Sequence, residues 1–349
     1  MLLYLHIPFC DSKCFYCGFN SYTSKHRFIS EYMKAICIQL KYELKNLNKK
    51  SIESVFIGGG TPSCVKAFEY EKFFEIVRDY LKEDVEITAE ANPNSALKEW
   101  LLEMRNFGVN RISLGVQSFF EDKLKFLGRA HNSQKAKEAV FLAKDAGFPH
   151  INIDLIYSTI FDTKERLKRE IEEAFSLPID HISGYALTLE EGTPFENRKD
   201  VKKENEDEAV FFANEIKDRG FIQYEVSNFG SYKSKHNLGY WRGKEYIGIG
   251  AGAVGFKRDF RYYPSFDIEG YIKDPLFRKT EPLTKEDLKI ERVFLGLRSE
   301  VGVCLDILND EEKKRVFLLE KEGKIKIKKK KFYNRNFFLA DEISLYILS

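Results

Sequence analysis

The sequence predicts an α/β protein that contains a partial (β/α)6 barrel and a small C-terminal α+β appendage. Six short apolar runs alternate with amphipathic stretches along the first half of the chain. This alternation is typical of parallel strands joined by right-handed helical crossovers. A complete barrel of this type would need eight such units. Near residue 280 the pattern changes to helical stretches and a lysine-rich alternating run, which predicts the appendage.

The predicted strands come first, because function gathers at their carboxyl ends in such a fold. They cover residues 2–7, 55–57, 85–89, 111–114, 151–156 and 181–187. Polar and glycine-containing segments follow most of these strands directly. We therefore expect a functional site at this end of the sheet.

Apolar side chains at helical spacing predict the helices between these strands. The first three carry stripes over residues 29–47, 73–81 and 100–107. Gly108 is expected just after the third helix, because glycine readily takes the conformation that ends a helix. Ser133 and Thr163 are expected to be the N-cap residues of the fourth and fifth helices.

The rest of the chain predicts an extension of the barrel and then the appendage. A helix is expected at 204–219, and the glycine- and aromatic-rich segment 224–256 is expected to form strand and loop that extend or close the barrel. Helices at 283–297 and 310–322 and a strand or hairpin at 324–331 are expected beyond it. This predicts a barrel with its extension over 1–280 and a small domain over 281–349.

Charge and hydropathy limit the partners. Of 349 residues, 56 are Lys or Arg and 54 are Asp or Glu, so a net charge of +2 gives no general reason to expect nucleic acid. No apolar run reaches the roughly 18–20 residues of a membrane span, and the first residues lack the features of a secretory signal. We expect a cytoplasmic protein with at most peripheral contact between lysines 328–331 and an anionic membrane surface.

Three of the six cysteines lie on one short loop after the first predicted strand. They are Cys10, Cys14 and Cys17, and the other three cysteines are isolated. In a reducing compartment such a group indicates a metal centre or catalysis rather than disulfides. Three thiolates can hold a [4Fe–4S] cluster with one iron left open, or a zinc ion that takes its fourth ligand elsewhere. The spacing favours the cluster and leaves zinc, or no metal, as alternatives.

The spacing C-x3-C-x2-C resembles the motif of the radical S-adenosylmethionine (SAM) superfamily, in which the amino and carboxylate groups of SAM fill the open iron site. Further motifs follow in family order: YLHIPFC (4–10), GGGTP (58–62), EANP (90–93), GVQSF (115–119), GRAH (128–131) and IDLIY (153–157). Together they resemble the oxygen-independent coproporphyrinogen III oxidase family and, more closely, its HemW heme-chaperone branch. The resemblance covers most of residues 2–300 and implies a radical SAM barrel whose [4Fe–4S] cluster is held by the three clustered cysteines.

The resemblance also implies which residues contact SAM. These are Tyr4 near the cluster, Tyr16 and Ala186 at the adenine, Gly59, Gly60 and Thr61 at the methionine end, and Glu90, Gln117, Arg129 and Asp154 at the charged and ribose groups. Arginine can pair with a carboxylate and aspartate can accept from ribose hydroxyls. Taken singly, each residue has a simpler explanation as part of a turn, a helix cap or a solvated charge. The prediction therefore depends on their joint placement after successive strands.

In this superfamily a reduced cluster cleaves SAM to methionine and a 5′-deoxyadenosyl radical. The resemblance therefore implies a low-potential electron donor, such as flavodoxin or ferredoxin, as a partner. The protein would orient SAM and exclude water and oxygen. Whether the chain acts as an enzyme stays open at this point.

The segment HNLGYW (236–241) resembles the HNxxYW motif of the HemW branch. The resemblance implies heme contacts at His236, Tyr240 and Trp241, with Arg242 close to a propionate. Histidine nitrogen is a standard axial ligand of heme iron. From the residues alone, the alternative is an aromatic core pair beside a histidine with ordinary hydrogen bonds.

Three features separate a heme chaperone from the oxidase. Phe19 stands where the oxidase pattern usually has another cysteine, the first cysteine comes early at residue 10, and the HNxxYW motif is present. They favour a protein that binds heme and transfers it to acceptor hemoproteins, among which we expect respiratory ones. The alternative is an oxygen-independent coproporphyrinogen III oxidase that decarboxylates its substrate in heme biosynthesis.

Two positions depart from the family pattern. Residues 158–163 read STIFDT in place of the usual Gly-Leu-Pro-Gly-Gln-Thr loop, and Val254 stands where relatives often have histidine. The first departure replaces a glycine turn close to the expected site. Its effect on the local geometry is a question for the structure.

Overall fold

A twelve-stranded sheet forms the centre of the larger part of the molecule in the computed structural model, which describes residues 1–203 and 206–349. Six parallel strands make up its middle: β1 (Leu2–Ile7), β2 (Ile52–Gly59), β3 (Leu81–Ala91), β4 (Arg111–Gln117), β5 (His150–Tyr157) and β6 (His181–Ala186). All six predicted strands are confirmed, as is the α/β class. Their burial on both faces explains the near-continuous apolar runs.

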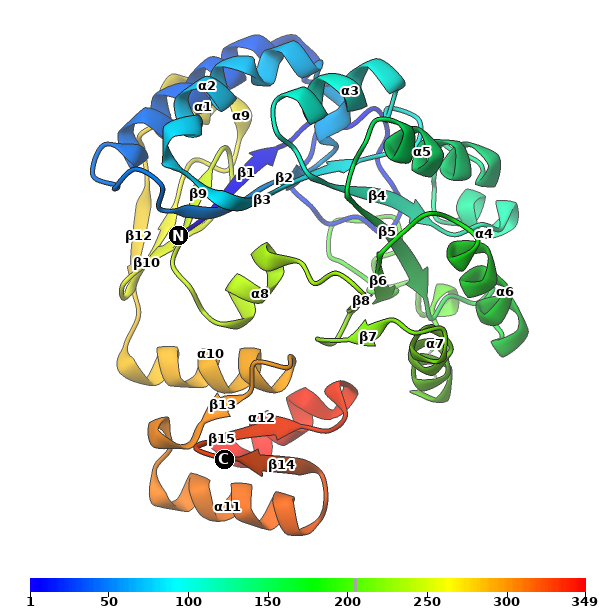
Figure 1. Cartoon of the computed structure of the whole chain (residues 1–349), viewed down its shortest axis with the longest axis vertical. Coiled ribbons are helices and arrows are strands. Elements are labelled where there is room, and N and C mark those ends of the chain that lie inside the picture. Colours follow the sequence, from blue (N-terminus) through cyan, green and yellow to red (C-terminus); the bar gives the residue numbers. More distant parts are fainter. Residues whose placement is uncertain (204–205) are drawn as a thin grey trace.

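Helices cover the outer side of this curved sheet (Figure 1). They are α1 (Ile29–Leu44), α2 (Glu71–Val77), α3 (Lys98–Asn106), α4 (Glu121–Phe126), α5 (Ser133–Asp145) and α6 (Lys164–Phe175). Short 3-10 turns lie at His26–Phe28, Pro62–Cys64, Ala67–Tyr70, Arg78–Tyr80, Lys199–Val201, Leu305–Ile307 and Phe337–Leu339. Each parallel pair from β1 to β6 is thus joined through at least one helix, as the alternation predicted.

The helix ends confirm two predictions and correct two. Gly108 follows α3 with φ +104°, and the Thr163 side chain accepts a hydrogen bond from the Arg166 N–H at the start of α6. The prediction of Ser133 as a cap is wrong: Asn132 caps α5, because its backbone is extended and its side chain accepts from the Lys135 N–H. The helix predicted from the apolar stripe over 73–81 is one residue too long, because the helical turns end at Tyr80 and β3 begins at Leu81.

After β6 the chain extends the sheet at both edges. The segments are α7 (Glu206–Asp218), β7 (Ile222–Gln223), β8 (Asn228–Gly230), α8 (Lys235–Trp241), β9 (Tyr246–Ile249), β10 (Gly255–Lys257), β11 (Phe260–Tyr263), α9 (Ile268–Lys273) and β12 (Lys279–Pro282). β8 pairs with β6, and β9 pairs in parallel with β1. Among the described strands the two edges, β7 and β12, do not pair with each other, so the barrel is extended rather than closed. The first two residues of the predicted helix 204–219 lie outside the described residues.

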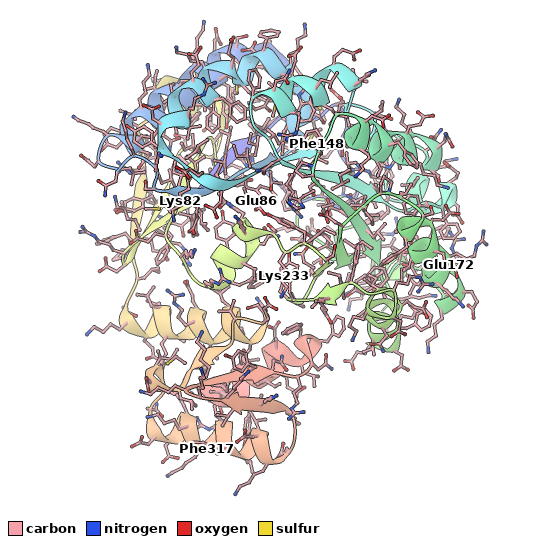
Figure 2. The ribbon with its side chains drawn as sticks, in the orientation of Figure 1. Lys82, Glu86, Phe148, Glu172, Lys233 and Phe317 are labelled. Atoms are coloured by element: carbon pink, nitrogen blue, oxygen red, sulfur yellow. The ribbon has the colours of Figure 1, made fainter. Side chains whose placement is uncertain are left out.

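Helix α8 was not predicted, and it lies on the inner side of the curved sheet (Figure 1). Its seven residues include a glycine and three aromatic rings, which weaken any helical pattern. The local signal was Ser234, whose side chain caps the helix by accepting from the Asn237 N–H. The buried Glu86 carboxylate of β3 accepts the backbone N–H groups of Lys235 and His236, and so fixes this helix to the sheet (Figure 2).

The C-terminal residues build a smaller layer with its own apolar cluster. It contains α10 (Lys285–Leu297), β13 (Val303–Cys304), α11 (Asp310–Lys321), β14 (Ile325–Lys328), β15 (Lys331–Asn334) and α12 (Ala340–Leu348). The predicted helices at 283–297 and 310–322 and the hairpin at 324–331 are confirmed, whereas α12 was missed. The division at residue 280 stays a prediction. None of the described helices has the length and apolar character to cross a membrane.

Candidate functional site

A cavity of about 480 Å³, the first cavity, opens at the carboxyl ends of the parallel strands. The predicted site residues that line it are Cys10, Cys14, Tyr16, Cys17, Gly59, Gly60, Thr61, Glu90, Gln117, Arg129, Asp154 and Ala186. Tyr4 is the one residue of the predicted cluster and SAM set that lies elsewhere, in a neighbouring cavity. The structure thus brings together residues that span the chain from position 10 to position 186.

The cysteine loop presents three reduced thiols to this cavity. The Cys10 thiol lies 3.3 Å from Thr61 Oγ1, and the Cys14 thiol accepts a hydrogen bond of 3.0 Å from Arg129 Nη1. Burial raises the pKa of the Cys10 and Cys17 thiols, and the neighbouring thiols of the group raise it further. Within the described residues that line the cavity there is no fourth cysteine and no histidine. The donor set therefore suits an iron–sulfur cluster with one open iron better than a four-ligand zinc site.

The end of β2 continues against the cysteine loop. The Gly60 N–H donates to the Ile7 carbonyl (2.8 Å), and the Thr61 N–H donates to the Phe9 carbonyl (2.7 Å). A Cβ at Gly60 would lie 2.7 Å from that Phe9 oxygen, so only glycine permits this approach. The GGGTP motif therefore places backbone and hydroxyl groups beside the thiols.

Arg129 is held by the cavity wall yet keeps one nitrogen free of hydrogen bonds. Its Nη2 donates to Asn92 Oδ1 and to the Gly115 carbonyl, both at 2.7 Å, while its buried Nε has no partner among the described residues. An anionic ligand group would satisfy such a nitrogen. Asn92, which also donates to Thr61 Oγ1 (2.9 Å), was missed by the prediction, although it stands in the EANP motif.

Two partly buried carboxyl groups face the same cavity. Glu90 accepts from the Gly59 N–H (3.1 Å), and Asp154 accepts from Asn152 Nδ2 (2.8 Å). Burial, and next the charge of Asp154, raises the pKa of Glu90 to about 8. Burial also raises the pKa of Asp154. Glu90 is therefore protonated at neutral pH, and the pair favours a cationic ligand.

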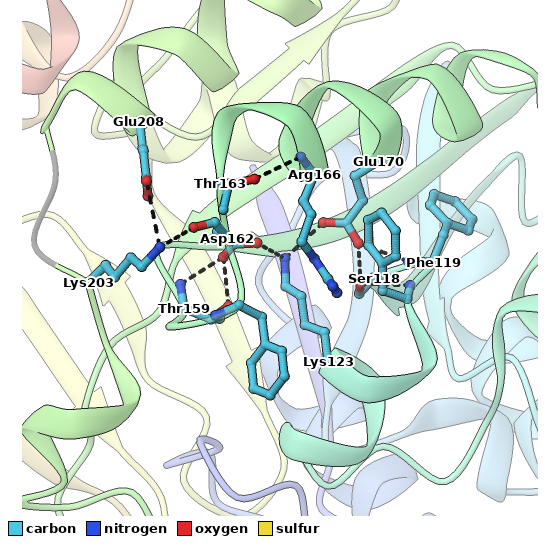
Figure 3. A network of polar contacts seen from close by, with 12 residues as sticks. Ser118, Phe119, Lys123, Thr159, Asp162, Thr163, Arg166, Glu170, Lys203 and Glu208 are labelled. Carbon is cyan, nitrogen blue, oxygen red and sulfur yellow. Dashed lines mark hydrogen bonds and ion pairs between the residues drawn. The ribbon is translucent and has the colours of Figure 1, made fainter.

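A buried ion triad braces the loops that follow β4 and β5 (Figure 3). Lys123 Nζ lies 2.6 Å from an Asp162 oxygen and 2.8 Å from a Glu170 oxygen, with all three side chains no more than 1% exposed. Glu170 also accepts from the Phe119 N–H (2.9 Å) and from the Ser118 hydroxyl. Burial alone would lower the pKa of Lys123, but Glu170 and Asp162 raise it, so the ammonium group stays charged.

The triad also supports the turn at Ser158, which the sequence marked as a departure from the family pattern. Ser158 takes φ +64° without being glycine, a conformation that costs energy and that the surroundings must hold. Asp162 accepts from the N–H (2.8 Å) and the hydroxyl (2.7 Å) of Thr159, next to Ser158. Gln117, at the end of β4, has a similar φ of +67° and lines the first cavity. The triad thus ties together two strained strand ends at the site.

A second cavity of about 610 Å³ adjoins the first and shares part of its wall. Both are lined by Gly18, Phe19, Gly59 and Glu90. The other lining residues of the second cavity are Tyr4, His6, Asn20, Tyr240, Tyr246, Gly252, Val254 and Phe266. His6, Tyr246 and Phe266 were not predicted to be site residues. Phe19 and Phe266 are about two-thirds exposed. The second cavity thus combines aromatic side chains with the carboxyl group of Glu90.

The residues of the HNLGYW motif differ in their access to the two cavities. Tyr240 lines the second cavity, whereas neither His236 nor Trp241 lines either cavity, and Arg242 is exposed. His236 is 1% exposed, with its ring centroid 5.2 Å from that of Phe56 and 4.8 Å from that of Tyr240. A bound group in the second cavity would therefore meet Tyr240 before His236.

The imidazole of His236 has one engaged nitrogen and one buried nitrogen without a partner. Its Nδ1 lies 2.8 Å from the Ser54 hydroxyl, and Nε2 has no hydrogen bond among the described residues. Burial lowers the pKa of His236 to about 3, so the ring is neutral. A neutral imidazole held through Nδ1 with Nε2 unsatisfied fits the requirements of a metal ligand.

Comparison with known proteins agrees with this geometry. The model of the radical SAM superfamily matches residues 4–174. The heme chaperone HemW of Lactococcus lactis is 35% identical over 317 residues, which cover 87% of this chain and 83% of the relative. The heme chaperone HemW of Escherichia coli is 38% identical over 263 residues, with 72% and 69% covered. The solved structure of coproporphyrinogen III oxidase (HemN) from E. coli matches with a TM-score of 0.82 at 20% identity, over 99% of this chain and 89% of that one, a likeness that concerns the fold alone.

Removing the cation of the buried triad should destabilise the protein strongly. Lys123→Met leaves the Asp162 and Glu170 carboxylates buried without their cation, which typically costs about 3–5 kcal/mol. Equilibrium urea unfolding of the metal-free chain measures the loss. Lys72→Met, which removes an exposed pair with Glu75, is the matched control and should leave the midpoint unchanged. Equal midpoints for both variants would contradict the bracing role.

The protonated state of Glu90 makes stability depend on pH. The pKa of Glu90 is about 8 in the folded protein, against 4.5 for the free group. Its contribution to the free energy of unfolding is therefore fully present below pH 4.5 and is lost as pH rises through 8. The free energy of unfolding should therefore fall relative to Glu90→Gln between pH 5 and 8, by up to ~1.4 kcal/mol per pH unit. Urea unfolding of both proteins across this range gives the difference. A difference that stays constant with pH would show that Glu90 is ionised in the folded protein.

Proposed function

The chain belongs to the HemW family of heme chaperones, within the radical SAM superfamily, and from this premise we propose that it binds heme and transfers it to acceptor hemoproteins. The observation that carries the proposal is the aromatic second cavity, which reaches Tyr240 of the HNLGYW motif and adjoins the three-cysteine cavity. Respiratory hemoproteins are the acceptors we expect. A cytoplasmic location, where thiols stay reduced, is the one we expect for clustered cysteines that are to bind a metal.

The first cavity would hold a [4Fe–4S] cluster and SAM. Cys10, Cys14 and Cys17 supply the three thiolates, and the unpartnered Nε of Arg129 suits the SAM carboxylate. The paired carboxyl groups of Glu90 and Asp154 suit the positive charges and ribose hydroxyls of SAM. When bound, the cluster supplies the electron for reductive cleavage of SAM. A flavodoxin or ferredoxin would deliver that electron to the cluster. The residues themselves orient SAM and keep water away.

The same cavity leaves room for the other SAM contacts that the resemblance implies. Tyr16, Ala186 and Gln117 line the walls, and Gly59, Gly60 and Thr61 supply backbone and hydroxyl groups at the end of β2. Tyr4 lies in the second cavity, where its hydroxyl is 2.9 Å from His6 Nδ1. We therefore assign Tyr4 to the boundary between the two ligands.

Heme would lie in the second cavity against Tyr240, whose ring contacts that of His236, and His236 would supply the ligand to its iron. The neutral ring and the unsatisfied Nε2 of His236 support this assignment. Phe19 and Phe266 offer apolar surface to a porphyrin. Trp241 is half-buried, Arg242 is exposed, and neither lines the second cavity, so their contact with heme stays a prediction from the resemblance.

The oxidase remains the second candidate because the fold matches HemN closely. Phe19 weighs against it. This side chain fills the position of the oxidase's additional cysteine and lies on the wall shared by both cavities. The chain therefore offers an apolar surface between SAM and the second ligand where the oxidase pattern has a thiol.

Iron analysis tests the cluster. Anaerobic reconstitution should yield about four irons per chain, and Cys→Ala at position 10, 14 or 17 should remove them because three thiolates are the minimum holding set. Iron and sulfide assays with the visible absorption spectrum make the measurement. Cys304→Ala, which alters an isolated cysteine of the appendage, is the control and should keep the iron. A preparation that takes up zinc only would refute the cluster.

Heme titration tests the chaperone function. Heme should produce a Soret shift, and His236→Ala or Ser54→Ala should weaken binding about tenfold or more, since loss of a ligand or of its orienting partner has such effects. His150→Ala, a half-exposed histidine away from both cavities, is the control. Turnover of coproporphyrinogen III without stable heme binding would instead establish the oxidase.

A further inference from the structure

A continuous chain of hydrogen bonds crosses the interior of the barrel from the first cavity to helix α8. Asn152 Nδ2 lies 2.8 Å from Asp154 Oδ1, and Asn152 Oδ1 lies 2.5 Å from His181 Nδ1. His181 Nε2 lies 2.7 Å from the Tyr224 hydroxyl, which in turn accepts from the Ser234 N–H at 3.2 Å. We call these five residues the interior chain. It joins a proposed SAM contact to the N-cap of the helix that carries His236.

Every donor in the interior chain points toward Asp154. Burial lowers the pKa of His181 well below its usual range, so the ring carries one proton. Two groups face Nδ1: Asn152 Oδ1, which can only accept, at 2.5 Å, and Arg111 Nη2, which can only donate, at 3.3 Å. The shorter contact places the proton on Nδ1, and Nε2 then accepts from Tyr224. The Ser234 N–H then donates to the Tyr224 oxygen. Hydrogen bonds aligned head to tail strengthen one another. A change at the Asp154 carboxylate therefore alters the strength of the other bonds of the interior chain.

The interior chain is shielded from water along its inner length. Asn152, His181, Tyr224 and Ser234 are each no more than 1% exposed. Solvent therefore cannot replace a broken bond, and each link costs more to lose than at the surface. Arg111, which is also buried, lies with its Nη2 3.3 Å from His181 Nδ1 and adds a fixed positive charge beside the chain.

At its far end the interior chain meets the anchor of α8. The Ser234 hydroxyl donates to Glu86 (3.3 Å), and the same carboxylate accepts the N–H groups of Lys235 (2.8 Å) and His236 (2.9 Å). The backbone at Ser234 is thus held by Tyr224 and Glu86 together. Releasing Tyr224 would leave the backbone N–H groups at the start of α8 held by Glu86, and the imidazole of His236 held by Ser54.

We propose that Asn152, His181 and Tyr224 are positioning residues that couple occupation of the first cavity to the placement of α8. A ligand that binds Asp154 orders this carboxylate, and the aligned bonds carry that order to Ser234. Both ends of this coupling, SAM and heme, rest on the proposed function. The coupling itself concerns the response of α8 to SAM and exists with or without heme.

Hydrogen exchange in the full-length, cluster-reconstituted protein tests the coupling without heme. SAM should slow amide exchange of residues 235–241 about fivefold or more, the lower end of typical coupling between sites. Tyr224→Phe removes one oxygen and both of its bonds, and should abolish this difference while SAM affinity stays within about twofold. His181→Gln, a second variant that breaks the chain one link earlier, should do the same.

Tyr271→Phe is the matched control. It also removes a fully buried hydroxyl, one that donates to Gln39 Oε1 (2.6 Å) outside the interior chain, and it should keep the SAM effect. The inference is overturned if SAM binds and α8 exchange does not change, or if the change survives in Tyr224→Phe. A protein that shows the coupling but binds no heme would refute the proposed function and leave the inference standing.

Discussion

The parallel pairing of β1 with β2 continues past the ends of the strands, and the first cavity depends on it. The register that sets Ile7 against Gly59 also lets Gly60 bond to the end of β1 and Thr61 bond to Phe9, which precedes the first cysteine of the loop. Because this contact joins backbone to backbone, it positions the thiols without help from their own side chains. The remaining walls follow from the same arrangement, since parallel strands deliver their carboxyl ends to one edge. A shift of this register would separate the thiols from Thr61.

The residues of the first cavity could be named from the sequence because the motifs resemble those of a known family, and because most of them closely follow clearly apolar strands. The second cavity could not, because Tyr240, Tyr246 and Phe266 reach Tyr4 only through the long-range pairing of β9 with β1. Periodicity does not reveal such a pairing. The burial of His236 also escaped prediction, since the motif names the histidine but not the ring of Phe56 that covers it. Adjacent Asn132 and Ser133 both suit a cap, so only the backbone conformation decided between them.

The interior of the barrel is more polar than the apolar strands suggested. Arg111, Asn152 and His181 are all buried there, and a second polar group, the Lys123 triad, lies under the loops at the carboxyl ends. Buried ions and amides add little net stability compared with apolar packing, but they penalise alternative arrangements in which partners are lost. Both groups act on segments that touch the two cavities. Both groups thus fix the geometry of the site more than they add to the stability of the fold.

The protonated carboxyl of Glu90 has a consequence for the energetics of ligand uptake. A cationic ligand in the first cavity favours the ionised form, so binding expels a proton to solvent. Calorimetry would then record a heat that varies with the ionisation enthalpy of the buffer, and apparent affinity would rise with pH toward 8. Because Glu90 also lines the second cavity, a proton released for one ligand leaves a negative charge facing the other. The two ligands would in this way be linked through a single titrating group on their common wall.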